Sequence, residues 1–113
     1  MASTRQEKVA RLIQKELSDI LQEQRLQYCK GAMITVTIVR MSPDLSFAKT
    51  FVSIFGPGQN LQDVFNHLNA NVKAIRIELA QRVRHQLRIV PEIAFNIDDS
   101  LDYIENIDNI LKQ

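Results

Sequence analysis

Residues 33–55 read MITVTIVRMSPDLSFAKTFVSIF, and this stretch decides the fold. Apolar and polar side chains alternate from Met33 to Val39, which predicts a β-strand. One face of that strand is expected to hold Ile34, Val36 and Ile38. Aromatic and β-branched residues dominate Phe47–Phe55 and predict a second strand. Pro43 and Asp44 favour a turn between them, because proline fixes φ and aspartate bonds the nearby backbone. The two strands should therefore form an antiparallel hairpin.

A helix is expected on the N-terminal side of the hairpin, from about Thr4 to Gln24. Its apolar stripe repeats at steps of three and four residues and contains Val9, Leu12, Ile13, Leu17, Ile20 and Leu21. Either Ser3 with Gln6 or Thr4 with Glu7 provides a capping box at its start. A loop is expected to connect this helix to the first strand.

Two consecutive helices are expected on the C-terminal side of the hairpin. Asn60 is placed to cap the first of them, and the second is expected to end near Gln86. We expect a kink at Asn69, Ala70 and Asn71, because short polar side chains compete for the backbone hydrogen bonds of a helix.

A third strand and a final helix complete the predicted order. Ile93–Ile97 alternates again, and a crossover through the two helices favours parallel pairing of this strand with the second one. A last helix is expected to start near Asp99 or Ser100. Its apolar stripe contains Leu101, Ile104, Ile107 and Leu111. The order helix, strand, strand, helix, kink, helix, strand, helix predicts an α+β fold, with the helices on one face of a three-stranded mixed sheet.

Length and composition restrict the class of protein. The 113 residues fit a single domain, and a hydrophobic content of 45% permits a packed core. Cys29 is the one cysteine, so an internal disulfide is excluded and a reduced, cytoplasmic setting is expected. No apolar run approaches the ~20 residues that span a bilayer, so we expect no membrane partner.

Charge is divided unevenly along the chain. Residues 1–88 contain 13 basic and 7 acidic residues, whereas residues 89–113 contain 1 basic and 6 acidic residues. This division suggests a basic working surface for a polyanion and an acidic end. The candidate basic residues lie on the first helix and around the helix pair: Arg5, Lys8, Arg11, Lys15, Lys73, Arg76, Arg82, Arg84 and Arg88. The alternative is a solvated surface with ion pairs such as Glu78–Arg82.

Signatures of catalysis are weak in this sequence. His67 and His85 are isolated and have no neighbours at the spacing of metal ligands, so no metal site is expected. Glu92, Asp98 and Asp99 resemble a carboxylate cluster of a hydrolase, but helix capping explains the aspartates more simply. We therefore expect neither an enzyme nor a cofactor.

Several segments, taken in order, resemble the ribosome-binding factor A family over nearly the whole chain. They are EKVARLIQKELS (7–18), MITVTIV (33–39), SPDLSFAK (42–49), Leu68-Asn69, Ile75-Arg76, LAQR (79–82), PEI (91–93), Phe95 and DDS (98–100). The resemblance implies one type II KH-like RNA-binding domain over residues 1–113. In this family a kink between the paired helices replaces the Gly-x-x-Gly loop of KH domains.

The resemblance also implies a function and partners. It implies a non-catalytic ribosome biogenesis factor that binds the small (30S) ribosomal subunit and its 16S rRNA during late maturation and rRNA processing. A monomer without a small-molecule substrate is expected. Because the helix pair takes the place of the nucleic-acid-contacting loop, the nine basic residues are expected to form the RNA-binding surface. For Arg76, pairing with a structural carboxylate is the alternative role.

One motif departs from the family, and two other functions stay open. The family kink commonly reads Ala-x-Gly, whereas the matching positions here are Asn71-Val72-Lys73. Asn71 tolerates a left-handed backbone better than most residues, which would partly replace the glycine. One alternative is a KH-like regulator that binds single-stranded RNA, which the missing Gly-x-x-Gly loop disfavours. The other is a protein–protein adaptor that uses the open face of the sheet or the acidic last helix.

Overall fold

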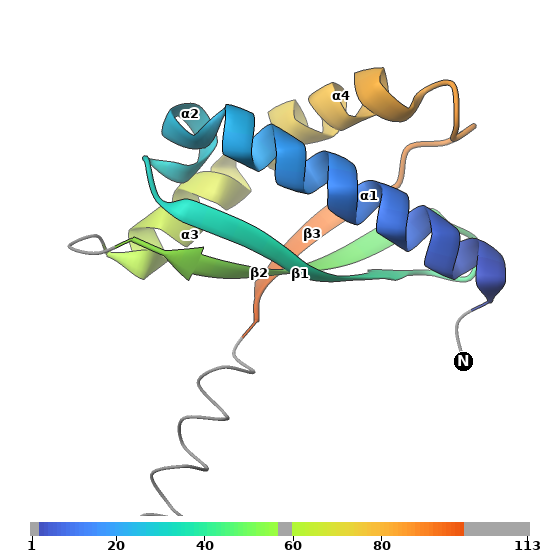
Figure 1. Ribbon diagram of the computed structural model, residues 1–113, viewed down its shortest axis with the longest axis horizontal. Coiled ribbons are helices and arrows are strands. Elements are labelled where there is room, and N and C mark those ends of the chain that lie inside the picture. The colour runs from blue at the N-terminus through green and yellow to red at the C-terminus, as the bar shows by residue number, and fades with distance from the viewer. Residues whose placement is uncertain (1–2, 57–59, 99–113) are drawn as a thin grey trace, which may run out of the picture.

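The computed structural model describes residues 3–56 and 60–98 and contains a three-stranded sheet (Figure 1). Its strands are β1 (Met33–Met41), β2 (Phe47–Phe55) and β3 (Glu92–Ile97), in the order β1-β2-β3. β1 pairs with β2 in antiparallel orientation, and β3 pairs with β2 in parallel orientation. The predicted mixed sheet is therefore confirmed.

A β-bulge at Thr37 changes which residues of β1 face the core. Val36 lies opposite Val52 and Ile38 lies opposite Phe51, so Thr37 is an extra residue on β1. As a result Ile38 is 43% exposed, while Val39 is buried. The prediction that Ile38 shares the face of Val36 was wrong, because strict alternation assumes a strand without a bulge.

The turn from β1 to β2 is organised by Asp44. Its Oδ1 accepts hydrogen bonds from Ser42 Oγ at 2.7 Å, from Ser46 Oγ at 2.8 Å and from the Ser46 amide at 3.1 Å. The bond from Ser42 contributes most, and together these bonds lower the pKa of Asp44 to about 2. The turn holds Leu45 at a φ of 63°, which is uncommon for a residue other than glycine. Leu45 nevertheless packs against the core.

Helix α1 (Thr4–Glu23) lies along the β1 side of the sheet. Ser3 and Gln6 form the capping box at its start, which is the first of the two predicted alternatives. Two glutamines of α1 bond to β1 carbonyl oxygens. Gln6 Nε2 donates to Met41 at 3.0 Å, and Gln14 Nε2 donates to Val36 at 3.1 Å and to Thr37 at 3.2 Å.

A short helix, α2 (Arg25–Cys29), occupies the segment that was predicted to be a loop. Five residues are too few to show an apolar repeat in the sequence, so this prediction was wrong. The helix is fixed by tertiary contacts, because Tyr28 and Cys29 are buried and Tyr28 Oη donates to Glu78 Oε2 at 2.8 Å. Lys30 ends it in the left-handed region, at a φ of 52°.

The predicted kink at Asn69, Ala70 and Asn71 is confirmed as a break between two helices. Helix α3 (Leu61–Ala70) is capped by Asn60, as predicted. A single residue, Asn71, separates it from helix α4 (Val72–Val83). Asn71 has a φ of −103° and a ψ of 10°, so the expected left-handed backbone is not used. Its Nδ2 instead donates to the carbonyl oxygen of His67 at 2.8 Å, which satisfies an end group of α3.

Helix α4 is shorter than predicted, because it ends at Val83 rather than near Gln86. The amides of Gln86 and Leu87 both donate to the carbonyl oxygen of Val83, at 2.8 Å each, and turn the chain away from the helix axis. The last predicted helix, from Asp99 or Ser100 onward, lies outside the described residues.

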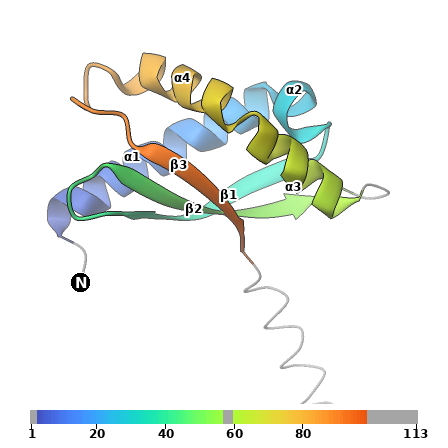
Figure 2. The same ribbon diagram turned by 180° about the vertical axis from the view of Figure 1, so that it is seen from behind.

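The core lies between the sheet and the helices, all four of which cover the same face of the sheet among the described residues (Figure 2). Its fully buried large side chains include Ile13, Leu17, Ile20, Leu21, Val52, Val64, Leu68, Ile75, Leu79 and Val83. Thr50 is buried among them, and its Oγ1 has no hydrogen-bond partner in the described part of the chain.

Candidate nucleic-acid interface

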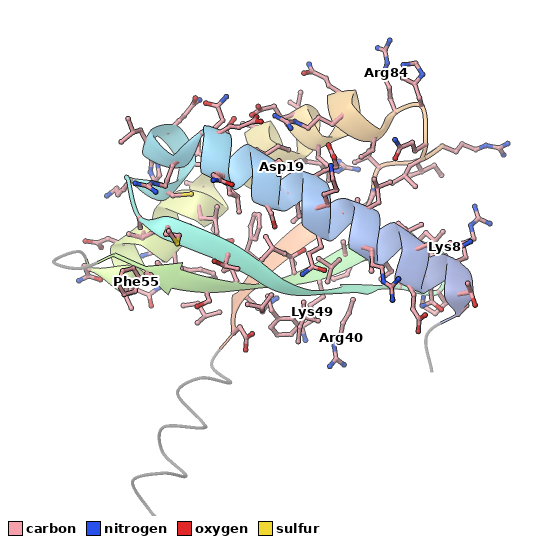
Figure 3. All side chains as sticks on the ribbon, in the orientation of Figure 1. Lys8, Asp19, Arg40, Lys49, Phe55 and Arg84 are labelled. Atoms are coloured by element: carbon pink, nitrogen blue, oxygen red, sulfur yellow. The ribbon has the colours of Figure 1, made fainter. Side chains whose placement is uncertain are left out.

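Helix α1 presents its predicted basic residues to solvent. Arg5, Lys8 and Arg11 are exposed, because they lie off the stripe that packs on the sheet. Lys8 projects from the N-terminal end of the helix (Figure 3). Lys15 differs from these three, because its Nζ lies 3.0 Å from Glu16 and 3.6 Å from Asp19. Glu16 first and Asp19 second raise the pKa of Lys15, and both carboxylates lie beside its charge within α1.

A hollow of about 460 Å³ lies beside the start of α4. It is lined by Lys73, Arg76, Ile77, Ala80, Ile89 and Val90. Ile77 and Ile89 are 62% and 68% exposed, so the hollow offers uncovered apolar surface next to two cations. Isolated exposed side chains of this size are normal, but two of them in one basic hollow form a candidate binding surface.

Arg76 is held at the rim of this hollow by backbone groups. Its Nε donates to the carbonyl oxygen of Pro91 at 3.1 Å, and one terminal nitrogen donates to that of Val90 at 2.9 Å. Both acceptors are neutral, and no carboxylate of the described residues forms an ion pair with Arg76. The alternative that Arg76 pairs with a structural carboxylate is therefore not found among the described residues. The guanidinium is oriented, and its charge remains available to a ligand.

A second hollow has a volume of about 210 Å³. It is lined by Arg5, Val9, Asp44, Leu45, Gln86, Leu87, Arg88 and Ile89. Ile89 lines both hollows, so the two share one residue. We call the two hollows together the basic groove and define it by Arg5, Lys73, Arg76, Ile77, Arg88 and Ile89. Asp44 contributes one opposing charge at the Arg5 end.

The remaining candidate residues lie outside the basic groove. Arg82 forms an ion pair with Glu23 of α1, and that bond raises the pKa of the guanidinium. Glu78, the partner that the sequence suggested for Arg82, bonds to Tyr28 instead. Arg84 is exposed at the end of α4 (Figure 3), where its Nε donates to His85 Nε2 at 3.4 Å. Lys8 and Arg11 are not among the residues that line either hollow.

Sequence reasoning missed the two apolar residues of the groove. Ile77 lies outside the stripe of Ile75, Leu79 and Val83, and Ile89 lies in an irregular segment before β3. An isoleucine off the apolar stripe of an amphipathic helix, such as Ile77, can be recognised in the sequence as a candidate binding residue. Ile89 could not be recognised, because its position depends on the path of the chain after α4.

Two of the three carboxylates that suggested catalysis, Glu92 and Asp98, lie at opposite ends of β3. Glu92 is at the start of β3 and Asp98 follows its end, while Asp99 lies outside the described residues. Asp98 Oδ2 accepts a hydrogen bond from Thr37 Oγ1 at 2.6 Å. Within residues 3–56 and 60–98, no three His, Cys, Asp or Glu side chains gather as metal ligands. No helix of this part is long and apolar enough to cross a bilayer.

The sequence of the chain matches a known family along most of its length. The model of the ribosome-binding factor A family matches residues 5–111. The chain belongs to this family. Ribosome-binding factor A of Christiangramia forsetii is 44% identical over 111 residues, which cover 97% of this chain and 84% of the relative. Ribosome-binding factor A of Flavobacterium johnsoniae is 46% identical over 112 residues, which cover 98% of this chain and 85% of the relative.

Solved structures of ribosome-binding factor A share the fold. The crystal structure of the Thermus thermophilus protein superposes with a TM-score of 0.67 at 20% identity, covering 81% of this chain and 94% of that one. A homology model of the Thermus thermophilus protein was fitted into a cryo-EM map of a 30S–RbfA complex. That model superposes with a TM-score of 0.51 at 18% identity, covering 74% of this chain and 96% of the other. These likenesses agree with the α+β architecture described above.

Proposed function

We propose that this chain is a non-catalytic maturation factor that binds the small (30S) ribosomal subunit through its 16S rRNA. The observation that carries the proposal is the basic groove. Lys73 and Arg76 line one of its hollows with Ile77 and Ile89, and Arg88 lines the other with Ile89. The family and the 30S complex of a structural relative support the choice of partner. Such a partner also implies a cytoplasmic location.

The chemistry of the groove suits RNA. Lys73 and Arg88 supply mobile cations for phosphates, and the oriented guanidinium of Arg76 can accept a phosphate through its remaining donors. Ile77 and Ile89 supply apolar contact for a sugar or an unstacked base. Lys73 and Arg76 of α4 thus supply the cations that a phosphate requires.

The paired cations have a different role in this proposal. Arg82 links α4 to α1 through Glu23, and Lys15 is offset within α1. We therefore propose Lys73, Arg76 and Arg88 as the principal contacts, with Arg5 at the edge. Lys8, Arg11 and Arg84 contribute long-range attraction. Lys15 and Arg82 contribute little to binding.

Two alternative functions remain distinguishable from this one. A regulator of single-stranded RNA would bind free RNA as tightly as it binds the subunit. An adaptor would bind a protein partner, and its binding would not depend on the basic groove.

The test is co-sedimentation of the full chain with purified 30S subunits. Lys73→Glu with Arg88→Glu is expected to weaken binding at least tenfold, because two attractive contacts become repulsive. The matched control is Arg40→Glu with Lys49→Glu, which reverses two exposed cations on the opposite side of the sheet (Figure 3) and should bind normally. Unchanged binding by the double variant would remove the basic groove from the interface.

A further inference from the structure

One face of the sheet is not covered by any described helix. α1 to α4 all pack on the other face (Figures 1 and 2). The uncovered face exposes the apolar side chains of Ile38 and Phe47, which are 43% and 40% exposed. An antiparallel sheet often leaves one face in water, but that face is then polar. Here the uncovered face carries apolar as well as polar side chains, which indicates that another segment or molecule covers it.

The same face is basic. Arg40 lies opposite Lys49 in the antiparallel register, and both point to the side away from the helices (Figure 3). Lys49 Nζ lies 5.4 Å from the ring centroid of Phe51, so the cation and the aromatic ring are in contact. We call Ile38, Arg40, Phe47, Lys49 and Phe51 the open face. Its occupant must offer apolar groups and negative charge together.

The chain itself passes to this side of the sheet at the end of β3. The amide of Asp98 donates to Val52 at 2.8 Å, and its carboxylate accepts from Thr37 Oγ1 at 2.6 Å. Thr37 is the bulged residue, and its Oγ1 also donates to the carbonyl oxygen of Phe51 at 3.2 Å. The end of β3 bends away from the helix layer (Figure 1). Asp98, the last described residue, is therefore bonded to the residue next to Ile38 of the open face.

The sequence after Asp98 has the required chemistry. Residues 99–113 contain four acidic residues and one basic residue, a net charge of −3. The spacing of Leu101, Ile104, Ile107 and Leu111 predicts one apolar stripe. A 15-residue helix would be ~22 Å long at 1.5 Å per residue, whereas a nine-residue strand spans ~30 Å. The segment is therefore short enough to lie across the sheet.

We propose that residues 99–113 fold back onto the open face of the sheet within the same molecule. The apolar stripe would cover Ile38, Phe47 and Phe51, and the acidic side chains would lie near Arg40 and Lys49. The arrangement would bury both surfaces and turn the two-layer fold into three layers. This inference does not depend on RNA binding by the basic groove.

The test uses a nitroxide spin label on the full chain at Asn109→Cys. The native Cys29 is fully buried, so a thiol reagent at neutral pH labels the introduced cysteine selectively. Paramagnetic broadening is then read from backbone amide signals. We expect the amides of Arg40, Lys49 and Ala94 to lose most of their intensity, and those of Lys73 and Ala80 on α4 to keep most of theirs. Equal or greater losses on α4, or no losses on the sheet, would overturn the proposal.

Two variants and one mixture make the result specific. Arg40→Glu with Lys49→Glu, both on the surface, should restore intensity on the sheet, whereas the matched reversal Arg84→Glu should not. Ile104→Ser with Ile107→Ser should also restore intensity, and losses that persist in both double variants would contradict docking. A mixture of isotope-labelled and spin-labelled chains should show no broadening, since broadening there would mean that a second copy covers the open face.

Binding of 30S subunits distinguishes a further outcome. If Arg40→Glu with Lys49→Glu weakens co-sedimentation as strongly as the basic-groove variant does, RNA occupies the open face and the docking proposal fails. Loss of binding only in the basic-groove variant would leave the proposed function intact, whatever the spin label shows.

Discussion

Arg76 Nε donates a hydrogen bond of 3.1 Å to the carbonyl oxygen of Pro91, and this bond joins the middle of α4 to the residue before β3. The crossover from the helix pair into the sheet is thus closed by a side chain that also lines the basic groove. Arg76 therefore has a structural role besides its proposed role in binding, so its substitutions need a measurement of stability as well as one of binding.

Arg76→Lys separates the two roles. It keeps the positive charge but loses the planar fork that reaches Pro91 and Val90. We expect the free energy of unfolding in urea to fall by about 1 kcal/mol or less, because the bonds are partly exposed. Subunit binding should fall less than in Arg76→Gln, which loses the charge as well. Equal losses of binding in the two variants would mean that only the geometry of Arg76 matters.

The salt dependence of binding measures how many phosphate contacts the proposed interface makes. Neutralising two contacts with Lys73→Gln and Arg88→Gln should reduce the slope of log K against log salt by about 1.5, at ~0.7 to 0.9 per contact. Binding titrations of 30S subunits at several salt concentrations measure this slope. The same measurement on Lys15→Gln should leave the slope nearly unchanged, because Glu16 and Asp19 already offset that charge.

Thr50→Val is expected to stabilise the protein. Thr50 is fully buried, and its hydroxyl has no partner in the described part of the chain. An unsatisfied buried hydroxyl costs about 1 kcal/mol or more, whereas a methyl group of similar size would be compatible with the surrounding core. Urea unfolding should show a gain of about 1 kcal/mol with an unchanged m-value. A loss of stability would show that the hydroxyl is satisfied in solution.

Asp44 makes the stability of the β1–β2 turn dependent on pH. Hydrogen bonds from Ser42 and Ser46 lower its pKa from 3.8 to about 2 in the folded state. The folded state therefore gains stability from the ionised carboxylate above about pH 4, and that gain disappears as the pH falls toward 2.

Asp44→Asn tests this linkage. The variant should melt below the parent protein at pH 7, and the difference in Tm should shrink as the pH falls from about 4 to about 2. Thermal unfolding followed by circular dichroism at each pH gives the comparison. A difference in Tm that stays constant over this range would show that the charge of Asp44 does not stabilise the turn.

The parts of the fold that local chemistry determines were predictable from sequence. The cap at Ser3, the cap at Asn60 and the helix break at Asn71 each depend on side chains that bond to backbone within four residues. The hairpin and the parallel third strand followed from alternation and from the length of the crossover. These signals sufficed for the order and pairing of the elements.

What sequence reasoning missed depends on contacts between distant residues. Helix α2 is held by the bond from Tyr28 to Glu78, which lies 50 residues away. The ion pairs of the candidate site also depend on contacts between distant residues. Arg82 is paired with Glu23, 59 residues away, so its sequence neighbours did not reveal that this cation is engaged. The sequence shows which residues are basic, but only the folded structure shows which of them form ion pairs and which can bind a ligand.

The glutamines of α1 have a consequence for self-association. β1 is an edge strand, and the exposed hydrogen-bonding groups of an edge are a template for another strand. Gln6 and Gln14 occupy the carbonyl oxygens of Met41, Val36 and Thr37 along that edge. A second strand can pair with these carbonyl oxygens only after the two glutamine side chains leave them. The first helix thereby blocks part of the β1 edge against pairing with another chain.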